Sequence, residues 1–111
     1  MSTMRILTQH ALKVRDSYRA LNEADGHKAW ETADYMAGFV GDVGDLSKLV
    51  MAKSGLRRGV LDVDSALAHE LSDCLWSVLV IADELGIDLE QSFLKTMNDL
   101  EQKIEKEKVI A

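Results

Sequence analysis

Two pairs of acidic residues in this sequence have the types and the spacing that metal chemistry needs. Asp42 and Asp45 are three residues apart, and Glu70 and Asp73 repeat that spacing further along the chain. Residues three apart on a helix project from one face, so each pair directs two carboxylates to the same side. One interpretation is ordinary solvent-facing acids on an acidic protein. The other is a site between two helices, where four carboxylates would suit a hard cation such as Mg²⁺, with Mn²⁺ as the alternative.

The surroundings of both pairs favour a site. Three glycines, Gly38, Gly41 and Gly44, lie around the first pair, although each costs a helix about 1 kcal/mol relative to alanine. We therefore expect a close approach to the helix backbone there. Glu70 and Asp73 form a narrow acidic edge on an otherwise apolar segment, and buried carboxylates must be paired, protonated or bound to a metal.

The remaining motifs of common enzyme sites are not found in the sequence. His10, His27 and His69 form no metal-ligand spacing, and neither the His-Glu-x-x-His motif of zinc enzymes nor the Glu-x-x-His motif of di-iron bundles occurs. We expect the histidines to be surface or packing residues. There is no glycine-rich phosphate loop and no Gly-x-Ser-x-Gly elbow. Phosphate chemistry would therefore depend on a metal ion and on helices.

The composition restricts the partners. In 111 residues, 19 Asp and Glu outnumber 13 Lys and Arg, for a net charge of −6, which argues against binding a nucleic acid polymer or an anionic membrane. The single Cys74 lies in the apolar stretch 74–82, which predicts a buried thiol in a reducing compartment. That stretch is too short to span a bilayer, and no secretory pattern opens the chain. We expect a cytoplasmic protein.

The hydrophobic pattern predicts an all-α fold in a single domain over residues 1–111. Proline is absent, and apolar residues recur at spacings of three and four. The expected helices cover about 4–22, 32–53, 65–85 and 89–108, with a loop over 54–64. On the second helix, Phe39, Val43, Leu46 and Val50 form the expected core stripe, with Asp42 and Asp45 opposite it. The third helix is apolar almost all round, which suits the centre of an assembly, and a domain this small gains from subunit association.

Three segments together resemble a known family. They are GFVGDVGDLSKL at 38–49, ELSD at 70–73 and ADELGIDL at 82–89. In order and separation they resemble the MazG-like all-α nucleoside triphosphate pyrophosphatases, whose signature is Glu-x-x-Glu on one helix and Glu-x-x-Asp on the next. The likeness covers about residues 30 to 104.

The resemblance implies a four-helix MazG-like bundle completed by oligomerisation, as a homodimer or homotetramer. It also implies Mg²⁺-dependent hydrolysis of a nucleoside or deoxynucleoside triphosphate between the α and β phosphates, giving the monophosphate and pyrophosphate. Asp42, Asp45, Glu70 and Asp73 would then be both the metal ligands and the catalytic residues.

One departure from the family keeps other functions open. Asp42 and Asp45 stand where the family usually has glutamates, so each carboxylate is one methylene shorter. A closer metal, a bridging water or a closer backbone would compensate. Alternatively, the protein is a non-catalytic or degenerate helical oligomer that acts as a regulatory or partner-binding module. A third hypothesis is a relative that acts on another pyrophosphate-containing nucleotide, such as phosphoribosyl-ATP.

Five further residues are candidates for substrate binding. Lys48 lies one turn beyond Asp45, Arg57 lies in the loop beside Arg58, and Lys95 resembles the basic position on the family's last helix, although the residues that follow it do not match. The alternative for each of these three residues is an ordinary solvent-exposed cation with no role in binding.

Trp30 and Ser77 complete the set of candidates. Trp30 stands where related proteins often have an aromatic residue near the base, and its alternative role is a hydrophobic staple at the start of a helix. Ser77 extends the acidic edge by one turn, and its alternative is a hydrogen bond to its own helix backbone.

Overall fold

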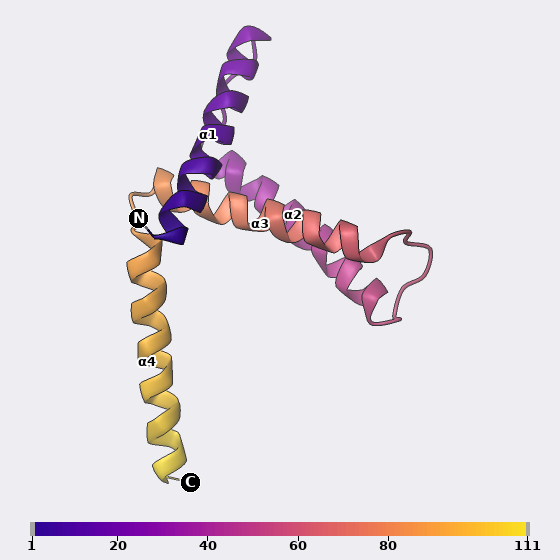
Figure 1. Cartoon of the computed structure of the whole chain (residues 1–111). Coiled ribbons are helices and arrows are strands. Elements are labelled where there is room, and N and C mark those ends of the chain that lie inside the picture. The colour runs from indigo at the N-terminus through magenta and orange to yellow at the C-terminus, as the bar shows by residue number, and fades with distance from the viewer. Residues whose placement is uncertain (1, 111) are drawn as a thin grey trace.

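The computed structural model describes the backbone of residues 2–110 and the side chains of residues 2–108; within them the chain is all-helical, with four helices and no strand (Figure 1). The helices are α1 (Thr3–Ala24), α2 (Thr32–Lys53), α3 (Val63–Glu84) and α4 (Leu89–Ile110). Every helix end lies within two residues of the expected one. The start of α3 is earlier than expected because the Asp62 carboxylate accepts a hydrogen bond from the Ser65 N–H and caps the helix.

Glycines end α2 and α3, as their positions in the sequence predict. Gly55 and Gly86 have φ angles of +79° and +68°, a left-handed conformation that favours glycine. The following residues, Leu56 and Ile87, donate backbone hydrogen bonds to carbonyls five residues earlier in the helix, each at 2.9 Å. This is the Schellman arrangement, and it turns the chain sharply out of each helix.

The α2–α3 hairpin is the main packed unit of the chain. α2 and α3 lie antiparallel along their length, α1 packs against α3, and α4 runs away from the other helices (Figure 1). The buried apolar side chains are few and lie mainly where α1 and α2 meet the C-terminal half of α3; they are Ala11, Tyr35, Leu79, Val80 and Ala82. A single chain therefore does not form a compact four-helix bundle.

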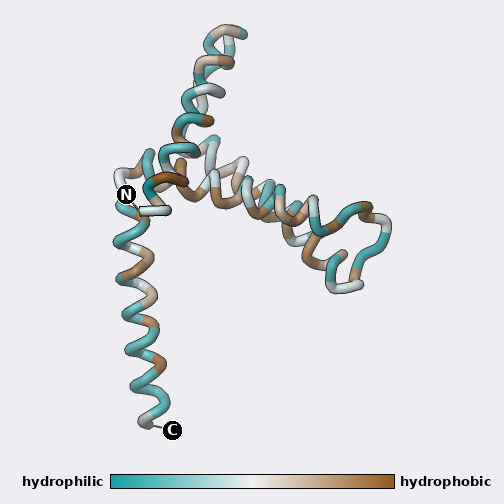
Figure 2. The backbone as a smooth tube through the Cα atoms, viewed as in Figure 1, coloured by the Kyte–Doolittle hydropathy of each residue, from teal (hydrophilic) through white to brown (hydrophobic). Residues whose placement is uncertain are grey.

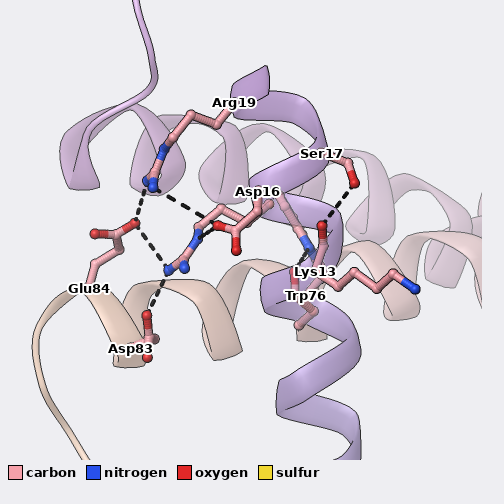
Figure 3. Close-up of polar contacts among 9 residues, drawn as sticks. Lys13, Asp16, Ser17, Arg19, Trp76, Asp83 and Glu84 are labelled. Carbon is pink, nitrogen blue, oxygen red and sulfur yellow. Dashed lines mark hydrogen bonds and ion pairs between the residues drawn. The ribbon is translucent and has the colours of Figure 1, made fainter. Parts of the chain in front are cut away.

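Polar contacts attach α1 to α3. The Arg15 side chain is 12% exposed, and its guanidinium donates to the carboxylates of Asp83 at 2.6 Å and Glu84 at 3.5 Å. Figure 3 shows Arg19 of α1 reaching Glu84 as well. Nearby, the Trp76 indole N–H donates to the Ala11 carbonyl at 3.0 Å. These contacts fix the end of α3 against the middle of α1.

The prediction of which α2 residues face the core is partly wrong. Phe39 and Leu46 are half-buried, but Val43 and Val50 are 43% and 50% exposed. The helix is turned so that Asp42 lies on the side that faces α3. The reason is that Tyr35, Phe39, Asp42, Leu46 and Leu49 recur at helical spacing as regularly as the expected stripe does.

α3 is less enclosed than its composition predicts. Its Leu71 and Leu75 are exposed, and Cys74, expected to be buried, is a half-buried free thiol. Figure 2 shows apolar segments recurring on every helix, including the projecting α4. By length and composition alone α3 could cross a membrane, because the helix extends the apolar stretch on both sides; the core helix of a soluble protein meets the same criterion.

Candidate metal centre

The facing sides of α2 and α3 bring together the four acids singled out by the sequence. One carboxylate oxygen from each of Asp42, Asp45 and Glu70 lies within 4.8 Å of the other two. Glu70 belongs to a second group of the same dimensions, with Asp73 and His69. Asp42, Glu70 and Asp73 are half-buried, whereas Asp45 and His69 are exposed. We call Asp42, Asp45, Glu70 and Asp73 the carboxylate cluster.

Burial and mutual repulsion raise the pKa values of two acids of the carboxylate cluster. Burial raises the pKa of Asp42, and the charges of Asp73 and Asp45 raise it further. The pKa of Glu70 is raised first by burial and then by Asp42, Asp73 and Asp45. In addition, the Oε2 atom of Glu70 is buried without a hydrogen-bond partner. A buried oxygen without a partner is costly, and a cation within the cluster would supply one.

These donors fit Mg²⁺ or Mn²⁺. Carboxylate oxygens are the ligands that hard cations prefer, and a zinc site would usually contain more nitrogen or sulfur. The shorter side chains of Asp42 and Asp45 still bring their oxygens within 4.8 Å of Glu70. Asp42 lies on the α3-facing side of α2, which places its carboxylate beside that of Glu70.

His69 is exposed, as expected for a surface residue, but it also lies beside the carboxylate cluster. Its Nε2 atom lies 3.1 Å from a carboxylate oxygen of Asp73, four residues later on α3. The imidazole therefore belongs to one of the two groups that can hold a metal ion. The spacing of four between His69 and Asp73 was the available signal, and it was missed because only His–His and Glu–His patterns were considered.

A cavity of about 550 Å³ adjoins the carboxylate cluster between α1, α2 and α3. Asp42 and Asp73 belong to both, so the cavity opens directly onto the cluster. Much of the remaining wall is aromatic. The full set of lining residues is Val14, Tyr18, Arg19, Asn22, Trp30, Tyr35, Asp42, Ser72, Asp73 and Trp76.

The aromatic rings form a connected series along the cavity. The Trp30 and Tyr35 ring centres are 5.5 Å apart, those of Tyr35 and Trp76 are 5.9 Å apart, and those of Trp76 and Tyr18 are 6.2 Å apart, all edge-to-face. Edge-to-face contacts of this kind hold the rings in place. Trp30 at 46% and Tyr18 at 57% remain substantially exposed, so apolar ring surface is available to a planar ligand.

Trp30 combines the two roles proposed for it. It precedes the first turn of α2 and packs on Tyr35, which is the contact of a hydrophobic staple, and it also lines the cavity. Its ring lies over Gly38, where a Cβ atom would be 3.3 Å from Trp30 Cζ3. The expected close approach to α2 is therefore made by Trp30 at Gly38, whereas Gly41 and Gly44 face open space.

The other candidate substrate-binding residues do not line the cavity. Lys48 is exposed on α2, and Arg57 is exposed in the loop at the far end of the hairpin. Lys95 lies on α4, where its ammonium group pairs with Asp99 at 2.7 Å. Ser77 is 2% exposed, one turn beyond Asp73 on α3. Within one chain, the structure does not gather these four side chains with the carboxylate cluster.

Two polar residues of the cavity were missed in the sequence. Arg19 and Asn22 lie one turn apart on α1 and both line the cavity. The sequence predicts a helix over about 4–22 and assigns neither residue a role in the site. No local pattern gives their role, because it depends on how α1 crosses α3.

Comparison of the chain with family models, with curated proteins and with solved structures found no match in any of the three. The resemblance to the MazG-like pyrophosphatases therefore depends on the residue pattern alone.

Proposed function

We propose that this protein is a Mg²⁺-dependent nucleotide pyrophosphohydrolase that cleaves a nucleoside or deoxynucleoside triphosphate to the monophosphate and pyrophosphate. One observation supports this most: a carboxylate cluster that can hold a metal ion shares Asp42 and Asp73 with an aromatic cavity. A nucleotide has the matching shape, with a planar base at one end and phosphates that need a cation at the other.

In this proposal the carboxylate cluster binds the cation, and Mn²⁺ can replace Mg²⁺. Bound there, the ion would neutralise phosphate oxygens and would orient or acidify a water molecule. Water attacks the α-phosphorus, the bond from that phosphorus to the bridging oxygen breaks, and pyrophosphate leaves. One of the four carboxylates accepts the proton of the attacking water, directly or through a second water.

The cavity would receive the base. The exposed faces of Trp30 and Tyr18 offer stacking surfaces, and the Asn22 amide offers one donor group and one acceptor for the edge of a base. Lys48 and Arg57 remain proposed phosphate ligands. Lys95 could contribute only from another subunit, because α4 runs away from the hairpin of its own chain.

We also propose that the MazG-like bundle is completed in a homodimer or homotetramer, and that the protein works in the cytoplasm without a membrane or nucleic acid partner. The net charge of −6 supports the absence of polyanionic partners other than a metal-bound substrate.

One observation favours the alternative, a non-catalytic regulatory or partner-binding module. Among the residues that line the cavity, Arg19 is the one cation, and its guanidinium is already 3.4 Å from the carboxylate of Glu84. A site for a triphosphate usually supplies several donors of positive charge.

A pyrophosphate-release screen separates the two functions. Wild type is compared with Glu70→Gln over the common NTPs and dNTPs, with Mg²⁺ or Mn²⁺. Glu101→Gln, which removes an exposed acid of α4, is the matched control. Metal-dependent turnover that Glu70→Gln abolishes and Glu101→Gln retains supports the enzyme. No turnover on any nucleotide, together with no metal-dependent thermal shift, supports the module.

A further inference from the structure

The Tyr35 side chain is buried, yet the chain leaves its hydroxyl group without a partner. Tyr35 is 4% exposed. Within residues 2–108, its hydroxyl group takes part in none of the side-chain hydrogen bonds of the structure. A buried tyrosine hydroxyl usually finds a partner, and a buried polar group without one is costly. A ligand in contact with this hydroxyl would supply the missing partner.

The Tyr35 hydroxyl group is open to the cavity. Among the described side chains, Glu70 Oε2 is the buried oxygen that has neither a partner nor contact with solvent. The Tyr35 hydroxyl oxygen, which also has no partner, is therefore not closed off from solvent. Tyr35 borders the cavity of about 550 Å³ between α1, α2 and α3, so the open part of its hydroxyl group faces that cavity.

Two tryptophans hold the Tyr35 ring in place. The rings of Trp30 and Trp76 lie edge-to-face with it, at interplanar angles of 64° and 71°. The indole N–H of Trp76 is already bonded to the Ala11 carbonyl, so it is not available to a ligand. A polar group whose position is fixed before binding loses little freedom when a ligand arrives. The Tyr35 hydroxyl therefore has the properties of a built contact.

The Tyr35 hydroxyl lies at the end of the cavity remote from the carboxylate cluster. Tyr35 precedes Asp42 by seven residues, which is two turns on the same face of α2 and about 10.5 Å along its axis. Helical side chains lean toward the N-terminus, which takes the hydroxyl further from Asp42. On the antiparallel α3, Trp76, which contacts Tyr35, lies one turn beyond Asp73. A nucleotide with its α-phosphate at the cluster would extend its base toward Tyr35.

The position of the hydroxyl favours one part of the base. The exposed rings of Trp30 and Tyr18 are the surfaces proposed to stack on the faces of the base, so polar contacts fall to its edge. The edge remote from the sugar carries an exocyclic oxygen or nitrogen, at C4 of a pyrimidine or at C6 of a purine. A hydroxyl both donates and accepts, so it can pair with a keto oxygen or with an amino group there.

From these observations we infer that the Tyr35 hydroxyl binds the exocyclic group at C4 of a pyrimidine or C6 of a purine and selects nucleotides that carry this group. The inference rests on the proposed function, because it uses the base site assigned there. A site that hydrogen-bonds one group of its ligand discriminates against a ligand without that group, since the protein group is then left unpaired.

Binding of nucleosides to the full chain tests the inference without metal or phosphate. The common nucleosides are compared with pyrimidin-2-one riboside and purine riboside, which lack the exocyclic group at C4 or C6. Each is titrated into wild type and Tyr35→Phe, and binding is followed through the indole N–H resonances of the two tryptophans. We expect the tightest-binding common nucleoside to bind wild type about fivefold more tightly than its analogue. Tyr35→Phe should bind both with the affinity of the analogue, because the two deleted groups are each other's partner.

Three results would overturn the inference. One is a Tyr35→Phe variant that binds the common nucleoside as tightly as wild type does. Another is an equal loss for the nucleoside and its analogue, which would show that Tyr35 acts through packing. The third is a wild type that binds no nucleoside at millimolar concentration. Nucleoside binding without turnover would contradict the proposed chemistry alone, and turnover without the hydroxyl effect would contradict the role of Tyr35 alone.

Thermal unfolding checks the starting observation separately. If the Tyr35 hydroxyl has no partner in the chain, its removal breaks no hydrogen bond. Tyr35→Phe without ligand should therefore have a Tm equal to or above that of wild type. A Tm several degrees below that of wild type would show that the hydroxyl is bonded within the protein, and it would overturn the inference.

Discussion

The carboxylate oxygens of Asp42, on α2, and Glu70, on α3, lie within 4.8 Å of each other. Their pKa values are both raised, first by burial and then by neighbouring acids. When no cation is present, the repulsion between acids held this close destabilises the packing of the two helices. The account of function depends on this relationship, because the same arrangement becomes favourable once a divalent cation is bound.

Without metal, removing one acid should stabilise the protein. A raised pKa in the folded state contributes stability below the ordinary value of Asp42, 3.8, and that contribution is lost as the pH rises through the higher folded value. At neutral pH we therefore expect Asp42→Asn to raise the Tm of the metal-free protein by a few degrees, with the difference vanishing at a pH of about 3. Thermal unfolding followed by circular dichroism, in a chelator, measures this.

Addition of Mg²⁺ should make wild type more stable than Asp42→Asn. The Tm of wild type should rise with the concentration of the ion, because a ligand that binds the folded state stabilises it, whereas Asp42→Asn should respond weakly. Glu101→Gln serves as the control, and we expect its Tm to rise with Mg²⁺ as that of wild type does. A wild type that is already more stable than Asp42→Asn in chelator at neutral pH would contradict the stored repulsion.

Two glycine substitutions on α2 should differ in their effect on stability. Gly44→Ala should raise the free energy of unfolding by about 1 kcal/mol, because a Cβ atom there meets nothing within 4 Å. Gly38→Ala should gain less, because its Cβ atom would lie 3.3 Å from the Trp30 ring and the ring must shift. Urea unfolding with tryptophan fluorescence reports both effects. Equal gains at the two positions would show that Trp30 does not pack on Gly38.

If the cavity receives the base, Trp30→Ala should act mainly on substrate binding. Stacking of a base on an aromatic ring contributes about 1–3 kcal/mol, so KM should rise by about fivefold to about a hundredfold with a smaller change in kcat. Trp30→Phe keeps an aromatic face and should retain most of the affinity. Steady-state kinetics with the preferred nucleotide decide the point, and a fall in kcat at constant KM would place Trp30 outside the base site.

Arg15 should be a major attachment of α1. Its side chain is 12% exposed and its guanidinium lies 2.6 Å from the Asp83 carboxylate, so Arg15→Met would leave Asp83 and Glu84 without that partner. We expect a loss of about 2 kcal/mol in the free energy of unfolding. Lys13→Met, which removes an exposed charge from the same helix, should change stability little. Urea unfolding of both variants tests this, and similar losses would exclude a special role for the Arg15 contacts.

The residue types and spacings predicted much of this structure, because helices are local. The four helices, the glycine-terminated ends at Gly55 and Gly86, and the convergence of the acid pairs follow from periodicity and turn chemistry. The rotation of α2 could not be predicted, since two apolar stripes on it are equally regular and the partner helix decides between them. The same limit hid Asn22 and Arg19, which reach the cavity only through the crossing of α1 over α3.

Phosphorus NMR of a nucleoside triphosphate incubated with wild type and Mg²⁺ is the most direct test of the central claim, because it identifies the bond that breaks. We predict resonances of the monophosphate and of pyrophosphate that require Mg²⁺ and that Glu70→Gln abolishes. Orthophosphate and the diphosphate as products would contradict the account, and so would turnover that Glu70→Gln leaves unchanged.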